Sequence, residues 1–80
     1  MKPGDAIYLV CCRLMTEHSD TVESIHATFD GTNERFEGIK NHFRKQEGFR
    51  VDGETLNSFY VHGPNGLHRM YYVATRTLED

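Results

Sequence analysis

A single helical repeat of apolar residues lies in the middle of the chain, between segments with the patterns of β-strands. Phe36, Ile39 and Phe43 are spaced i, i+3 and i+7, the pattern of one narrow face of an α-helix. The first strand segment is apolar on both faces, as in a central strand, and the second alternates apolar and polar residues, as in a half-buried strand. Because one helix can cover only one face of a sheet, this order predicts an α+β fold whose second sheet face has no covering layer.

The alternating segments predict two β-hairpins, one before and one after the helix. The four strands are expected over residues 7–15, 22–29, 55–62 and 67–77. The first two run antiparallel because the polar connection between them is too short for a crossover. The turn-forming run Gly63-Pro64-Asn65-Gly66 joins the last two, and a loop of these four residues places Phe59 opposite Met70.

The helix is expected over residues 33–47. Asp30 or Thr32 can accept hydrogen bonds from the free N–H groups of its first turn, and Gly48 supplies a left-handed cap after its last turn. Residues 49–54 are expected to form a loop.

These elements predict one α+β domain over residues 1–80, with short tails at residues 1–5 and 78–80. The predicted architecture is a two-layer ββαββ sandwich, in which a four-stranded antiparallel sheet carries one helix on one face. The residues expected in the core are Phe29, Phe36, Ile39, Phe43, Phe59, Val61, Met70 and Tyr72.

The uncovered face of this sheet is the strongest functional signal in the sequence. In the predicted register it carries tyrosine and arginine, the residue types enriched where proteins meet. We therefore expect it to bind another protein or a second copy of the chain. The predicted partner-binding residues are Tyr8, Leu56, Tyr60, Arg69, Tyr71 and Val73.

The charge balance argues against a dedicated nucleic-acid binder. The chain has a net charge of −3, whereas contacts with phosphates require a basic surface. We therefore expect no nucleic-acid partner. A local basic cluster keeps binding of RNA or single-stranded DNA open as the alternative function, and its residues are Lys40, Arg44, Lys45 and Arg50.

Histidines and cysteines are the candidate metal ligands and nucleophiles. Zinc sites show paired ligands at short spacing, whereas the histidines stand singly at His18, His26, His42, His62 and His68. His62 and His68 flank the hairpin loop, and this pair can hold a metal only if the loop register allows it. Cys11 and Cys12 lie in an apolar strand, which disfavours a reactive thiolate. We expect no metal, no cofactor and no catalytic residue. Among the alternative functions, metal binding is the least favoured.

Two further features bear on location. The longest apolar run, residues 6–12, is far shorter than the roughly 20 residues that span a bilayer. Cys11 and Cys12 are adjacent, and neighbours in a strand point to opposite faces, so they cannot easily form a disulfide. We therefore expect no membrane association and a reducing, cytoplasmic location with free thiols.

Four short motifs follow one another along the chain: Ile7-Tyr8-Leu9, Phe29-Asp30, Gly48-Phe49 and Phe59-Tyr60-Val61. In this order the chain resembles small uncharacterised bacterial and phage domains built as hairpin, helix and hairpin. The resemblance covers most of the chain and implies the same fold, but it brings no settled activity. We therefore expect a small, non-enzymatic protein-binding or regulatory module, such as an inhibitor or adaptor of bacterial or phage origin.

Overall fold

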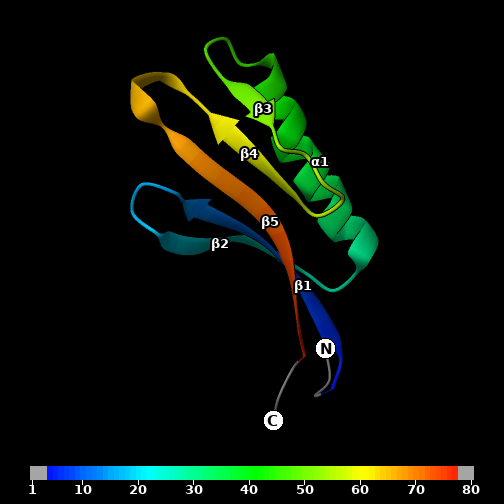
Figure 1. Ribbon diagram of the computed structural model, residues 1–80. Coiled ribbons are helices and arrows are strands. Elements are labelled where there is room, and N and C mark those ends of the chain that lie inside the picture. Colours follow the sequence, from blue (N-terminus) through cyan, green and yellow to red (C-terminus); the bar gives the residue numbers. More distant parts are fainter. Residues whose placement is uncertain (1–3, 78–80) are drawn as a thin grey trace.

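Five strands form one antiparallel sheet in the order β2-β1-β5-β4-β3, as the computed structural model shows for residues 4–77 (Figure 1). The elements are β1 (Ala6–Leu14), β2 (Ser19–His26), α1 (Phe29–Lys45), β3 (Arg50–Asp52), β4 (Ser58–His62), the 3-10 turn η1 (Pro64–Gly66) and β5 (His68–Thr77). The predicted α+β class, with one helix and an antiparallel sheet, is confirmed within these residues. Of the two predicted tails, residues 1–3 and 78–80 lie outside the described residues.

The predicted number of four strands is wrong, because β3 forms in the segment expected to be a loop. Its central residue, Val51, pairs with Val61 of β4 and packs against the core. A strand of three residues is too short to show an alternating pattern. Its position therefore depends on the tertiary contact with β4.

The register of the β4–β5 hairpin differs from the predicted register by one residue. His62 pairs with His68, so the loop comprises the five residues 63–67 and is closed by a hydrogen bond from the Gly63 N–H to the Leu67 carbonyl (3.0 Å). A shift of one residue turns every side chain of a strand to the other face. Phe59 therefore lies opposite Tyr71, not Met70.

The core lies between α1 and one face of the sheet. Phe36 of the helix packs edge-on against Phe59 with ring centroids 5.0 Å apart, and Phe59 stacks on Tyr71 at 5.3 Å. The fully buried cluster is Val10, Cys12, Phe36, Phe59, Val61 and Tyr71. Partly buried residues packed against it are Ile39, Phe43, Phe49, Val51, Leu67 and Val73.

Three of the predicted core residues are not core. The register shift places Met70 and Tyr72 on the opposite face of the sheet, where both side chains are half-buried. Phe29 is the first residue of the helix and is 59% exposed. The other five residues, Phe36, Ile39, Phe43, Phe59 and Val61, are buried in the core or packed against it.

The helix begins four residues earlier than predicted because Thr28, and neither Asp30 nor Thr32, is its N-cap. The Thr28 hydroxyl accepts a hydrogen bond from the Gly31 N–H (3.1 Å), and its carbonyl accepts one from the Thr32 hydroxyl (2.8 Å). The helix ends at Lys45, two residues before the predicted end, and its C-cap is Gln46 in an extended conformation, so the prediction of Gly48 as the cap is wrong. Gly48 has φ of +87°, the left-handed conformation that favours glycine, in the turn that follows. The earlier helix start leaves β2 ending at His26.

The helix packs across one face of the sheet, against strands that include β1, β3 and β5, and the paired ends of β1 and β5 project past its N-terminal end (Figure 1). Within residues 4–77, no helix has the length and apolar character needed to cross a membrane.

Truncation of two of the three helix phenylalanines, Phe36 and Phe29, distinguishes this core from the predicted one. We expect Phe36→Ala to lower the free energy of unfolding by about 3–5 kcal/mol, because a fully buried aromatic ring is lost. Phe29→Ala should cost about 1 kcal/mol or less, because this ring is mostly exposed and its recorded ring contact is the edge of Tyr8. Urea unfolding followed by circular dichroism measures both values. Equal costs for the two variants would contradict this placement of the helix.

Candidate functional site

The face of the sheet opposite α1 is the first candidate surface, and we call it the open face. Val10 and Cys12 of β1 point into the core, so Leu9, Cys11 and Arg13 point away from it. The strand pairings extend this set across the sheet. The open face comprises Asp20, Val22 and Ile25 of β2, Ile7, Leu9, Cys11 and Arg13 of β1, His68, Met70, Tyr72, Ala74 and Arg76 of β5, Ser58, Tyr60 and His62 of β4, and Arg50 and Asp52 of β3.

A β-bulge carries the apolar part of the open face to the edge of the sheet. Residues three apart in a regular strand point to opposite faces. In β2 the register shifts by one residue, so that Val22 pairs with Cys11 while Ile25 pairs with Leu9. Both side chains therefore lie on the open face, where Val22 is 55% and Ile25 is 59% exposed.

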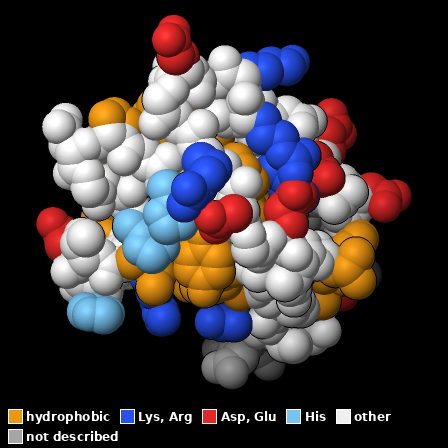
Figure 2. All heavy atoms as spheres, turned by 45° about the horizontal axis from the view of Figure 1, so that its top comes forward, with side chains coloured by type: hydrophobic (Ala, Val, Ile, Leu, Met, Phe, Trp, Pro, Cys, Tyr) orange, Lys and Arg blue, Asp and Glu red, His pale blue; other side chains and the backbone are white. Residues whose placement is uncertain are grey.

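The other end of the open face is polar, and its charges are paired. The Arg13 guanidinium donates to both carboxylate oxygens of Asp20 (2.8 and 3.2 Å) and holds the pKa of Asp20 below its usual range. Arg50 pairs with Asp52 at 3.2 Å. On the side of the molecule that Figure 2 shows, histidine, basic and acidic side chains likewise lie close together beside an apolar area.

Of the six predicted partner-binding residues, Tyr60 lies on the open face. The predicted positions of Arg69, Tyr71 and Val73 on that face are wrong, because the register shift turns them toward the helix side. Tyr8 shares the helix side with Val10 and contacts the Phe29 ring at 6.0 Å between centroids. Reasoning from the sequence missed Met70 and Tyr72, which a hairpin loop of five residues would have identified.

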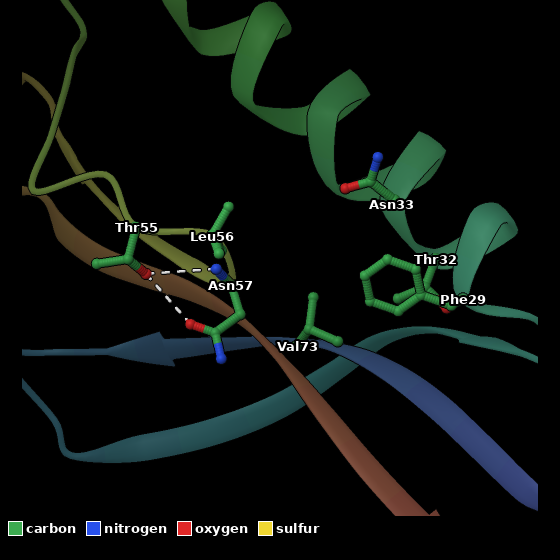
Figure 3. Close-up of a pocket in the computed structure, with 7 residues that line it drawn as sticks. All are labelled: Phe29, Thr32, Asn33, Thr55, Leu56, Asn57 and Val73. Atoms are coloured by element: carbon green, nitrogen blue, oxygen red, sulfur yellow. Dashed lines mark hydrogen bonds between the residues drawn. The ribbon is translucent and has the colours of Figure 1, made fainter.

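The sixth predicted residue, Leu56, lines an apolar groove on the helix side. The groove has a volume of about 560 Å³, and Figure 3 shows Val73 lying between Leu56 and the ring of Phe29. Leu56 is 98% exposed. At the Thr55 end of the groove the polar side chains are hydrogen-bonded to each other: the Thr55 hydroxyl donates to the Asn57 side-chain oxygen at 3.2 Å. The groove is lined by Phe29, Thr32, Asn33, Thr55, Leu56, Asn57 and Val73, and its walls can accept an apolar side chain.

The predicted basic patch is not a continuous cationic surface. The Lys40 side chain is only 7% exposed, and its ammonium contacts Glu37 (2.5 Å) and Glu54 (3.1 Å). Arg44 pairs with the same Glu54. Two of the four predicted cations, Lys40 and Arg44, are thus neutralised within the fold. Arg50 pairs with Asp52, so the predicted patch offers few free cations for contacts with phosphates.

Lys40 also packs on the aromatic core. Its nitrogen lies 5.2 Å from the centroid of Phe36 and 5.6 Å from that of Phe59, within range of a cation–π interaction. Burial disfavours the charged ammonium, but hydrogen bonds to Glu37 and Glu54 outweigh burial, so the pKa of Lys40 is raised. The lysine joins the helix to the segment before β4.

The two cysteines are buried on opposite faces of β1, Cys11 on the open face and Cys12 in the core. Burial raises the pKa of both thiols, while hydrogen bonds with Tyr72 and Tyr71 act in the opposite direction without reversing the shift. Both thiols are therefore protonated at neutral pH, the state that disfavours nucleophilic attack.

Replacing Glu54 tests the ion-pair cluster through its dependence on pH. The hydrogen bond from Lys40 lowers the pKa of Glu54, so this carboxylate stabilises the fold above its unfolded-state pKa and the contribution is lost as pH falls through the lowered value. We expect Glu54→Gln to melt below the parent at pH 7, and the difference to disappear at about pH 3. Glu47→Gln, at an exposed position outside the cluster, is the matched control and should melt like the parent. A difference for Glu54→Gln that persists in acid would contradict the charge-based explanation.

The open face and the apolar groove are the candidate binding surfaces that carry the predicted partner-binding residues Tyr60 and Leu56. The resemblance to small bacterial and phage domains stays a prediction. No family model, no curated protein and no solved structure matches the chain.

Proposed function

We propose that the chain is a small, non-enzymatic protein-binding module whose open face pairs with the same face of a second copy. The observation that carries the proposal is that α1 packs against one face of the sheet, while the opposite face presents contiguous apolar side chains. Leu9, Tyr60, Met70 and Tyr72 are half-buried there, and Val22 and Ile25 extend the apolar area to the edge. Buried free thiols fit a reducing compartment.

The chemistry of the open face favours a protein partner. Tyrosine and methionine are enriched at protein interfaces, and the centres of such interfaces are depleted of charged residues. Arg13 and Arg50 are each paired with an aspartate of the same face. These two arginines therefore do not oppose the approach of a second copy, and Arg76 lies at the end of β5, away from Tyr60 and Met70.

The shape of the molecule favours the same surface. Its extents are 43 × 25 × 17 Å, so it is flat. The ten residues of β5 span roughly 33 Å, and five strands side by side span roughly 20 Å, so the sheet lies along the two longer dimensions. A stable interface buries roughly 800 Å² per partner. This is about 15% of the total surface of 5460 Å², an area that requires a broad face such as a side of the sheet.

An exposed isoleucine at the sheet edge allows a test that leaves the core intact. We expect the parent to be a two-fold dimer by light scattering across a concentration series. Ile25→Asp should produce monomers, because it places an unpaired charge in the interface, and Tyr60→Ala should weaken the dimer by removing an aromatic anchor. Circular dichroism should show both variants folded.

Leu56→Asp is the matched control, since it removes an equally apolar and more exposed side chain on the helix side. It should leave the dimer unchanged. A parent that stays monomeric at every concentration would overturn pairing with a second copy. Dissociation by Leu56→Asp alone would identify the groove, and not the open face, as the interface.

A further inference from the structure

The register of the β4–β5 hairpin brings together two histidines that stand apart in the sequence. His62 and His68 are directly opposite each other at the last pair before the loop, and their rings lie 4.4 Å apart with 24° between their planes. The base of the loop is closely packed: a Cβ atom at Gly63 would lie 2.7 Å from the Phe49 ring, which would have to move to admit it. The two imidazoles are thus held together on the open face.

Asp52 of the neighbouring strand β3 supplies a carboxylate beside this pair. Its Oδ1 lies 3.4 Å from Nε2 of His62, longer than a good hydrogen bond. Two ligands of one tetrahedral zinc ion, each bonded at about 2.0–2.1 Å, are separated by about 3.3–3.4 Å. The spacing of these two atoms is therefore the spacing that a shared metal ion requires.

We propose that His62, His68 and Asp52 form a binding site for a zinc-like divalent ion. Two imidazoles and one carboxylate are a ligand set of the type that zinc takes in open sites, with water in the fourth position. Calcium and magnesium prefer oxygen ligands, so this set selects against them. All three ligands come from one chain but belong to the open face, which a dimer would cover. Zinc binding is therefore measured on the Ile25→Asp variant as well as on the parent, so that failure of the site and failure of the dimer are distinguishable.

The three side chains do not surround a common point in their present positions. No group of three or more His, Cys, Asp or Glu side chains within residues 4–77 is arranged to hold a metal. Binding therefore requires the His68 ring to turn out of its stack with His62. Its ring neighbours on this side are His62 and Tyr60, the latter at 5.7 Å between centroids, and the side chain is only half-buried.

Arg50 competes with the ion for Asp52. Its guanidinium lies 3.2 Å from Asp52 Oδ2, and its side chain is 70% exposed, so it can move away into solvent. A cation at this distance opposes the binding of a second cation. Removing the arginine charge should therefore strengthen metal binding, which a merely structural role of these residues would not produce.

Titration of the full, tag-free chain with zinc chloride in a calorimeter tests the site. We expect one ion per chain, with zinc raising the melting temperature of the parent. His62→Ala and His68→Ala should each lower the affinity at least about tenfold, and Asp52→Asn should lower it by a smaller factor. Arg50→Gln should raise it. His42→Ala, which removes an exposed helix histidine, is the control and should bind like the parent.

Each outcome decides the matter, since circular dichroism reports whether the variants fold. Cobalt binding gives a second readout, because tetrahedral coordination produces strong visible absorption that octahedral coordination lacks. Zinc affinity that is unchanged in both His62→Ala and His68→Ala would overturn the site, as would absence of binding by the parent at millimolar zinc. If a histidine variant fails to fold, weaker or unchanged binding by Arg50→Gln would overturn it equally.

Discussion

The register of the β4–β5 hairpin is the constraint on which most of this structure depends. β5 lies at the centre of the sheet between β1 and β4, so its alternation decides which side chains meet the helix. Five loop residues point Tyr71 toward Phe59 and Phe43, with ring centroids 5.3 and 5.7 Å apart. With four loop residues, Met70 and Tyr72 would have faced the helix instead. The same choice of loop sets His62 opposite His68.

The features predicted from the sequence are those determined by local pattern. The stripe of Phe36, Ile39 and Phe43 identifies the helix and its buried face, because helical periodicity involves only nearby residues. The strands around Val10, Phe59 and Tyr71 follow from their alternation in the same way. These patterns suffice for the α+β class and for a sheet with one helix on one face.

The missing features depend on contacts or on backbone conformations that alternation does not encode. The hairpin loop closes through Asn65 and Gly66, both with positive φ, and no local pattern distinguishes this loop from one that is a residue shorter. Lys40 lies fourteen positions before Glu54 in the sequence, so their ion pair appears only in the folded chain. Of the open face, the sequence therefore identified Tyr60 as a binding residue and His62 and His68 as a pair at the loop, but it did not identify Met70, Tyr72 or the face on which the other predicted residues lie.

The two edge strands of the sheet, β2 and β3, determine whether strands of other chains can pair with it. An edge strand exposes a row of backbone N–H and C=O groups that can template another strand, the first step toward amyloid-like extension. Here β2 is interrupted by its bulge and carries Asp20 and Glu23, while β3 ends after three residues. Both edges are therefore poor templates for further strands. A chain with this apolar sheet face can associate through that face in closed pairs and still resist polymerising edge to edge into fibrils.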